Sequence, residues 1–369
     1  RRPPAVDSLT AVRGVAAVWV VLYHFSPDLY VLLPASRALA PLIDRGHLAV
    51  PLFFTLSGYV LAMNYAPAFG GGLSAAGTKT FLLRRLIRIY PLHLATLLGT
   101  AAMVAVGARF GATVDPEGYG AVDFLLNLAL LHAWVPDFRL NWNLPSWSIS
   151  AEWFAYLLFP LLAAGLWRAS AGRRGRAAVG AVAGLALIET VVFYLYWRAR
   201  GLPFFELLSV VGPFTAGAAA WVWRERAAAP AGPWEPPGWA PWAATAVLVG
   251  GAFLPNVAAG KAVVLVGCVA VVVLLGAAGN RCPRAFRWRP LVALGEASYA
   301  LYLTHVMAQK VLYTLLPSGQ FADADGPVRA GAVAAYVAAI AAAAWLAQAT
   351  IERRLVPWLR RRATVRRPG

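Results

Sequence analysis

The chain has 369 residues, of which 60% are hydrophobic and only 13% are charged. Soluble domains usually carry about 25% charged residues, and a soluble protein of this size could not bury so much apolar surface. Lysine and arginine number 33 against 16 acidic residues, and the net charge is +17. Because the arginines stand in short clusters between apolar runs, they indicate the loops of a membrane protein and exclude a nucleic-acid-binding surface.

Apolar segments recur along the whole chain. A transmembrane helix needs about 20 mostly apolar residues. The first candidate follows Arg1 and Arg2, but no small-residue cleavage site follows it, so we interpret it as a span and not as a signal peptide. We therefore expect residues 1–369 to form one all-α, polytopic bundle of about ten transmembrane helices in the plasma membrane. The predicted spans are roughly 8–30, 47–66, 82–107, 147–167, 177–197, 203–223, 241–258, 262–279, 291–315 and 328–350.

The segment 123–146 decides the topology. Its apolar part is only about a dozen residues long, too short to cross, and a polar, proline-containing stretch follows. We expect a re-entrant or outer-surface segment. Most lysines and arginines then fall on one side with both termini, which the positive-inside rule places in the cytosol. That side also holds a Pro/Trp-rich loop at 227–242 and a basic tail at 351–369.

Two ionisable residues share the first predicted span. Charged groups inside spans are costly and are functional candidates by default. Arg13 and His24 are eleven residues apart, which on an α-helix is about 20° past three full turns and roughly 16 Å along the axis. Both side chains therefore share one face, with Arg13 toward the cytosol and His24 in the outer half. A snorkelling arginine beside a packed histidine is the alternative.

Glu152 and His305 are expected at the same depth as His24. A lone buried glutamate needs a partner, and His24 is the obvious one. Three groups from distant segments would thus converge in the outer half of the bilayer. A purely structural polar network would give the same pattern, and His305 could also bond to a tyrosine of its own helix.

Three arginines open the predicted span 82–107. Arg84, Arg85 and Arg88 lie at its cytosolic end, and Arg84 and Arg88 share a face that could clamp phosphates. Ordinary positive-inside anchoring is the alternative. His47, His93 and His132 lie at span ends, where an interfacial position is expected. Cys268 and Cys282 predict no disulfide, because one lies in an apolar run and the other in a basic loop.

Five segments, in chain order, resemble the motifs of acyltransferase family 3, a family of membrane-bound O-acyltransferases. Together they span nearly the whole chain. They are VDSLTAVRGVAAVWVVLYH at 6–24 with its Arg-x10-His spacing, PLFFTLSGYVLA at 51–62, RRLIRIYPLH at 84–93, WSISAEWFAYLLFP at 147–160 and GEASYALYLTH at 295–305.

The resemblance implies transfer of an acyl group from acyl-CoA, most simply acetyl-CoA, to a hydroxyl of a carbohydrate or of a glycosylated compound such as a macrolide. In that reading His24 is the general base, Glu152 orients it, and Arg13 lies beside the donor arm. The donor phosphates would bind Arg84, Arg85 or Arg88. Tyr302, Ser148, Ser150 and Ser57 are candidate donors to the thioester oxygen, and His305 joins them as a substrate-binding residue.

Three questions stay open at this point. A polysaccharide precursor suits the acceptor site nearly as well as a macrolide, and the acyl length is not fixed. An acyl-histidine intermediate is an alternative to direct transfer. A proton-coupled permease or sugar exporter, with His24, Glu152 and His305 as a proton relay, is the main rival function. We expect no metal, because no residues have ligand spacing.

Overall fold

A computed structural model describes residues 6–110, 118–136, 142–197, 200–201, 203–227 and 234–365 of the chain, and within these ranges it contains helices and no strand. The all-α prediction is confirmed for this part of the chain. The α-helices are α1 (Asp7–His24), α2 (Ser26–Leu32), α3 (Ala40–Ile43), α4 (Ala49–Gly71), α5 (Ala75–Arg109), α6 (Ala121–Leu128), α7 (Trp147–Ala169), α8 (Gly172–Val192), α9 (Phe205–Leu208), α10 (Val211–Ala227), α11 (Ala240–Ala252), α12 (Val257–Ala278), α13 (Arg289–Leu315), α14 (Gly326–Ala347) and α15 (Val356–Val365).

Shorter helical turns join these helices. The 3₁₀ turns are η1 (Pro34–Leu39), η2 (Gly46–Leu48), η3 (His132–Trp134), η4 (Leu144–Ser146), η7 (Gly279–Arg281), η8 (Arg284–Arg287) and η9 (Ser318–Phe321), and the π-helical turns are η5 (Phe193–Trp197) and η10 (Gln348–Leu355). The turn η10 joins α14 to α15 without a break. These three elements therefore form one continuous rod.

Every predicted span overlaps a helix, although the span 241–258 extends beyond α11 and not every helix is a clear membrane span. Seven stretches in the described chain are long and apolar enough to cross: Pro34–Gly71, Ala75–Arg109, Leu144–Ala169, Gly172–Tyr196, Phe205–Arg226, Val257–Ala278 and Gly326–Ala363. An eighth candidate is α1 with α2, bent by 72°. The 13 residues of α11 rise only about 20 Å. The chain is thus a helical membrane protein, and the count of ten spans stays a prediction.

The predicted first span, 8–30, corresponds to two helices, α1 and α2, and not to one straight helix. It bends between α1 and α2, where Pro27 lies in the first turn of α2. A proline lacks a backbone N–H and disfavours helical geometry in the residue before it. His24 is therefore the last residue of α1, directly before the bend.

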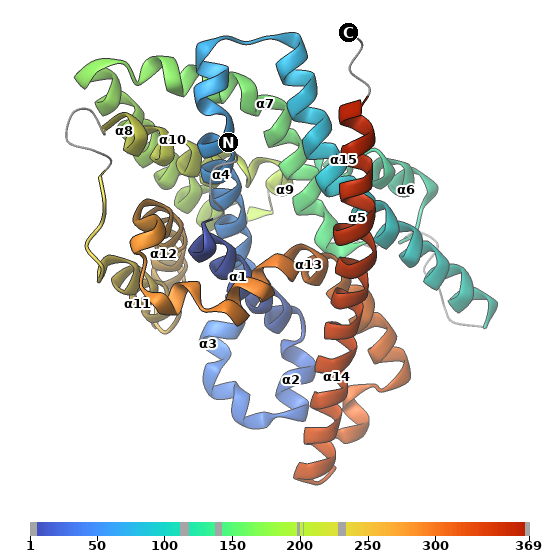
Figure 1. The fold of residues 1–369 in the computed structure, drawn as a ribbon. Helices are drawn as coiled ribbons and strands as arrows, with labels where there is room; N and C mark the ends of the chain where they lie inside the picture. Colours follow the sequence, from blue (N-terminus) through green and yellow to red (C-terminus); the bar gives the residue numbers. More distant parts are fainter. Residues whose placement is uncertain are drawn as a thin grey trace.

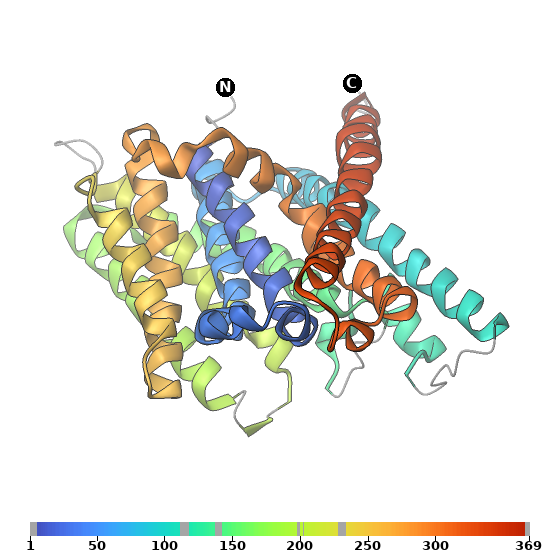
Figure 2. The ribbon, with the colours of Figure 1, turned by 90° about the horizontal axis from the view of Figure 1, so that it is seen from below.

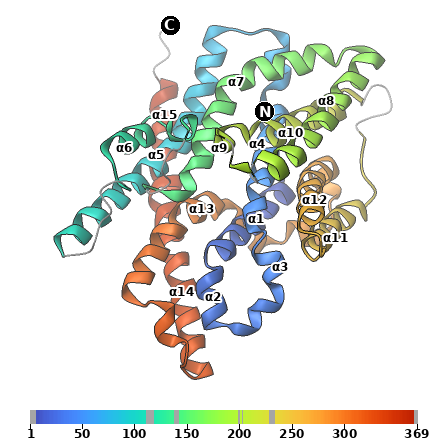
Figure 3. The same ribbon diagram turned by 180° about the vertical axis from the view of Figure 1, so that it is seen from behind.

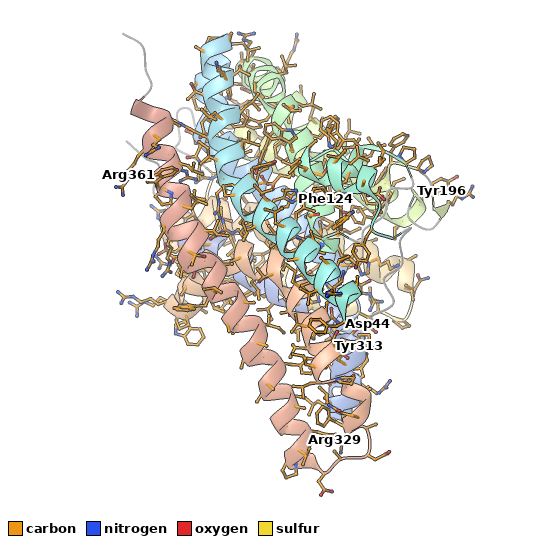
Figure 4. All side chains as sticks on the ribbon, turned by 90° about the vertical axis from the view of Figure 1, so that its right-hand side faces the viewer. Asp44, Phe124, Tyr196, Tyr313, Arg329 and Arg361 are labelled. Atoms are coloured by element: carbon orange, nitrogen blue, oxygen red, sulfur yellow. The ribbon has the colours of Figure 1, made fainter. Side chains whose placement is uncertain are left out.

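The helices form a bundle around α1 and α4. Figure 1 shows these two in the middle, with α11 and α12 on one side and α5, α14 and α15 on the other. In Figure 2, α1 begins and α15 ends at the same edge of the bundle. In Figure 4, Arg329 and Arg361 lie at opposite ends of the rod formed by α14, η10 and α15. These placements agree with termini on one side, and the cytosolic assignment of that side stays a prediction.

The segment 123–146 contains no described helix long enough to cross, because the eight residues of α6 rise only about 12 Å. Seen from behind in Figure 3, α6 lies on the outside of the bundle beside α5. In the predicted loop 227–242, residues 228–233 lie outside the described chain and α11 already begins at Ala240. The basic tail is helical as far as Val365, and 366–369 lie outside the described residues.

Small residues bring the central helices together. A methyl group added at Gly295 of α13 would lie 1.8 Å from the carbonyl oxygen of Thr10 in α1, and one added at Gly14 would lie 2.7 Å from the amide nitrogen of Gly295. Close backbone approach at small residues is a common way for membrane helices to associate. This contact sets the distance between α1 and α13, which carry Arg13, His24 and His305.

We expect Gly295→Ala to lower the thermal unfolding midpoint of the purified protein in detergent. The new methyl group forces α1 and α13 apart, and such overpacking typically costs about 1–3 kcal/mol. Gly331→Ala in α14 is the matched control, because a methyl group there would meet no atom within 4 Å. Equal unfolding midpoints for the two variants would contradict this account of the contact.

Candidate active site

A cavity of about 180 Å³ lies between α1, α4, α5, α7 and α13. On α4 the lining residues lie on one helix face and include Val50, Ser57 and Leu61. From Val50 to Leu61 this face extends about 16 Å along the helix axis. The cavity is therefore elongated along the bundle. Its polar lining residues are Arg13, Ser57, Arg85, Arg88, Ser148, Glu152, Tyr156, Ser298, Tyr299 and Tyr302.

Arg13 lies in this wall with its guanidinium bound to neutral groups. Nε donates to Ser298 Oγ at 3.1 Å and NH2 donates to the Gly295 carbonyl at 2.7 Å. In the described chain no carboxylate lies within ion-pair distance of Arg13. The two hydrogen bonds fix the side chain on α13, so its positive charge is available to an anionic or strongly polarised group in the cavity.

Glu152 does not bond to His24, and this part of the predicted geometry is wrong. Its Oε1 accepts a hydrogen bond from Ser57 Oγ at 2.6 Å, and both residues line the cavity. His24 does not line the cavity. The carboxylate thus belongs to the cavity, where it offsets part of the charge of the arginines.

The partner of His24 is His305. Nε2 of His305 lies 2.9 Å from Nδ1 of His24, and the ring centroids are 4.9 Å apart. Nδ1 of His305 lies 2.7 Å from the carbonyl oxygen of Tyr302. His305 is fully buried, whereas His24 is half-buried. The convergence of these two histidines from distant segments, predicted from depth, is observed.

This chain of contacts assigns the hydrogens on both rings. A carbonyl oxygen only accepts, so Nδ1 of His305 carries the hydrogen and Nε2 of the neutral ring accepts. The hydrogen between the rings then belongs to Nδ1 of His24. Nε2 of the neutral His24 ring then carries no hydrogen, and a nitrogen with a lone pair is what a general base needs.

Tyr302 connects the cavity with the histidine pair. Its hydroxyl lies 2.9 Å from Ser148 Oγ, and both groups line the cavity. The Tyr302 ring lies 6.0 Å from the ring of His305, one helical turn further along α13, and packs edge-on against Phe53. His305 therefore adjoins the end of the cavity formed by Phe53, Ser148 and Tyr302, and His24 is joined to that end through His305.

The arginines of α5 that face the cavity are not the pair that was predicted to share a face. Arg85 and Arg88 line the cavity, whereas Arg84 is exposed and lies outside its lining. Arg88 forms an ion pair with Glu352 at 3.2 Å and lies over the Tyr299 ring. The predicted pairing of Arg84 with Arg88 on a shared face is thus replaced by Arg85 with Arg88, three residues apart.

Ser150 lies away from the cavity lining. Its hydroxyl donates to the Leu130 carbonyl at 2.7 Å and accepts from the Ala133 amide at 3.2 Å. It holds the 128–134 turn against α7, so it drops out of the candidate substrate-binding residues. Because Ser148 and Ser150 are two residues apart on a helix, their side chains lie on different faces of α7, and this difference could be predicted from the sequence.

Two of the histidines predicted at span ends are buried inside the protein. His93 and His132 are almost completely inaccessible and stack with parallel rings whose centroids are 5.9 Å apart. Nε2 of His93 lies 2.8 Å from the Asn127 carbonyl, and Ser146 Oγ lies 3.2 Å from Nε2 of His132. They tie α6, η3 and η4 to α5. The free thiols of Cys268 and Cys282 agree with the prediction of no disulfide.

Ser298, Tyr299 and Tyr156 are lining residues that sequence reasoning missed. Ser298 and Tyr299 stand within GEASYALYLTH, and Tyr156 follows Glu152 by one helical turn. Their helical spacing from Tyr302 and Glu152 was the available signal.

Comparison with known proteins places this geometry in a family. A family model described as "Acyltransferase domain", that of acyltransferase family 3, matches residues 6–349. The chain is 34% identical over 165 residues to "Acyltransferase MdmB" of Streptomyces mycarofaciens, covering 43% of this chain and 40% of that protein. It is 39% identical over 98 residues to "Protein 2 in picA locus" of Rhizobium radiobacter, covering 26% of this chain and 43% of that protein.

The matched regions therefore span less than half the length of either relative. No solved structure matches the chain. The family match, in contrast, extends over nearly the whole chain and includes every helix that lines the cavity. The chain belongs to acyltransferase family 3.

Proposed function

We propose that this membrane acyltransferase moves an acyl group, most simply acetyl, from acyl-CoA to a hydroxyl of a carbohydrate or of a glycosylated small molecule such as a macrolide. The observation that carries the proposal is the His24–His305 pair, whose hydrogen bonds put the hydrogen of the neutral His24 ring on Nδ1 and leave Nε2 as the basic nitrogen, while His305 contacts Tyr302 of the cavity lining. The acceptor class follows from the family resemblance.

The cavity suits the pantetheine arm of the donor. It is elongated, it carries three arginines against one glutamate, and much of its wall is apolar. Phosphates of the donor would lie at Arg85 and Arg88, and the arm would pass Arg13 toward Tyr302. The thioester would then reach the end of the cavity that adjoins His24.

The transfer is written in two steps. Nε2 of His24 takes the proton of the acceptor hydroxyl while the oxygen attacks the thioester carbonyl carbon, forming a C–O bond. The tetrahedral intermediate then collapses, the C–S bond breaks, and the CoA sulfur leaves with the proton held by His24. The hydroxyls of Tyr302 and Ser148, and the guanidinium of Arg13, are the groups placed to stabilise the negative oxygen.

In this proposal His305 takes the orienting role that the sequence suggested for Glu152. Because its Nε2 accepts from His24, it holds the ring of the base in one tautomer and stabilises the imidazolium formed during transfer. Glu152 and Ser57 instead shape the electrostatics of the donor cavity. The two proposed steps use acyl-CoA as the donor and require no metal ion.

Purified protein in detergent is the system for the test. Acetyl-CoA is supplied with a panel of methyl glycosides and macrolides that carry free hydroxyls, and CoA thiol release and acetylated product are measured. We expect thiol release coupled one-to-one to product ester. Proton-coupled uptake of the same glycosides into vesicles, without consumption of acetyl-CoA, would instead support the permease. Labelled acyl-enzyme trapped without acceptor would replace direct transfer by the acyl-histidine route.

A further inference from the structure

The corner between α1 and α2 lies directly after His24. Helix α1 ends at His24, α2 begins at Ser26, and the two axes differ by 72°. The last carbonyls of a helix need partners other than the amides of their own helix. The position of the His24 ring depends on the main chain at this bend. Contacts that fix the main chain here therefore also fix the proposed base.

Gln309 of α13 holds the main chain at this point. Its Nε2 donates to the carbonyl oxygen of His24 at 2.9 Å and to Oδ2 of Asp28 at 3.3 Å. Both partners only accept, so the side-chain amide must present its NH2 group to them. Gln309 also lies one helical turn beyond His305 on the same helix. One face of α13 thus contacts His24 twice, at the ring and at the main chain.

Asp28 completes the arrangement from the other side of the corner. It is 5% exposed, and its Oδ1 accepts a hydrogen bond from Ser318 Oγ at 2.7 Å. In the described chain it forms no ion pair. A buried carboxylate held by neutral donors is costly. Asp28 also lies in the first turn of α2, where an acidic residue is favourable, and its contacts with Ser318 and Gln309 fix the main chain one turn after the base.

We propose that Asp28 and Gln309 are positioning residues for the acyl transfer. They fix His24 at the end of α1 so that its Nε2 faces the acceptor hydroxyl while its Nδ1 stays bonded to His305. The proposal rests on the proposed function, in which His24 is the base. It gives the base a second anchor that is independent of the cavity and of Glu152.

The first test measures kcat and KM for acetyl-CoA with the acceptor that gives the highest rate in the panel above. We expect Gln309→Leu and Asp28→Asn each to lower kcat at least about 10-fold, because misplacement of a reacting group by ~1 Å can cost 10²-fold. KM for acetyl-CoA should stay within about twofold, because neither residue lines the cavity. Asp28→Asn keeps the size but replaces one of the two carboxylate oxygens by an NH2 group, so Gln309 and Ser318 can no longer both donate to a negatively charged side chain.

Ser318→Ala is the matched control. It removes one hydrogen bond to the same carboxylate but leaves both bonds of Gln309, to the His24 carbonyl and to the charged Asp28, in place, so near wild-type kcat is expected. Wild-type kcat in both Gln309→Leu and Asp28→Asn would overturn the proposal. A parallel rise of KM for acetyl-CoA and fall of the unfolding midpoint in both variants would also overturn it, since that would indicate general loss of structure.

A second measurement separates this proposal from the proposed function. Diethyl pyrocarbonate modifies unprotonated imidazoles, and the rate at His24 is read by mass spectrometry with half-buried His47 as the internal reference. We expect modification of His24 to become several-fold faster in Gln309→Leu, with no change at His47. An unchanged rate at His24 refutes the positioning role. Absence of thiol release from the wild-type protein with every acceptor would refute the proposed function instead, and this readout would still stand.

Discussion

Replacement of His24 by alanine is expected to lower kcat by about 10²–10⁴-fold, the usual contribution of a positioned general base. KM for acetyl-CoA should change little, because His24 does not line the donor cavity. The measurement is steady-state release of CoA thiol by purified variant and wild-type protein at saturating acceptor. In the proposed mechanism the loss arises because Nε2 of His24 takes the proton of the acceptor hydroxyl, and an alanine has no group that could do so.

The matched control is His47→Ala. His47 is also half-buried, and its ring packs against Tyr23, which in turn packs against His24. It bonds to the Asp44 carbonyl and takes no part in the pair with His305. We expect this variant to keep most of its activity, and both variants to keep the wild-type unfolding midpoint. Wild-type turnover by folded His24→Ala would refute the assignment of the base.

The long helices and the site residues of α1 could be predicted from the sequence, because both follow from local periodicity. Arg13 and His24 share a face of α1 by spacing alone, and both are directed at α13, where they bond to Ser298 and His305 respectively. The depth of His305 followed equally from counting residues into its helix. Hydropathy likewise found the long helices, since their apolar runs are long, but not the short helices such as α3, α6 and α9.

The partner of His24 could not be read in the same way. Glu152 and His305 were predicted at the same depth, so both were candidate partners of His24. Counting residues along a helix gives the depth of a side chain but not the rotation of that helix toward its neighbours. The rotation depends on packing, here the close contact of Gly295 with Thr10 that brings α13 onto α1. The same limit explains Arg84: periodicity pairs it with Arg88, but packing turns Arg85 toward the cavity.

The bend after His24 had a sequence signal that hydropathy hides. Ser26-Pro27 marks a helix start inside an apolar run, and a window average does not register it. The anchoring by Gln309 had no such signal, because a single glutamine near the end of a span is unremarkable until its contacts are known. Contacts between residues 281 or more positions apart, such as Gln309 with Asp28, are a product of the tertiary fold.

The two adjacent arginines of α5 provide the sharpest test of donor binding. We expect Arg85→Gln to raise KM for acetyl-CoA by about 10–100-fold, because a hydrogen bond to a charged group is worth about 1.5–3 kcal/mol and each 1.4 kcal/mol is tenfold. Arg85 lines the cavity and forms no ion pair in the described chain, so its loss strands no carboxylate. Arg88 is a poorer choice, because its loss would leave Glu352 buried without its partner.

Arg84→Gln is the control, since it removes the same charge from the neighbouring position, outside the cavity lining. Its KM should stay within about twofold of wild type, because exposed charges are screened over roughly 10 Å at ordinary salt. Equal effects of the two variants on KM would favour general attraction of the donor by a basic surface. No effect of either would favour the anchoring role of the positive-inside rule, and the donor phosphates would then have to bind elsewhere. Only an effect confined to Arg85 identifies this end of the cavity as the donor entrance, because the two variants share chemistry and net charge and differ in the direction of one side chain.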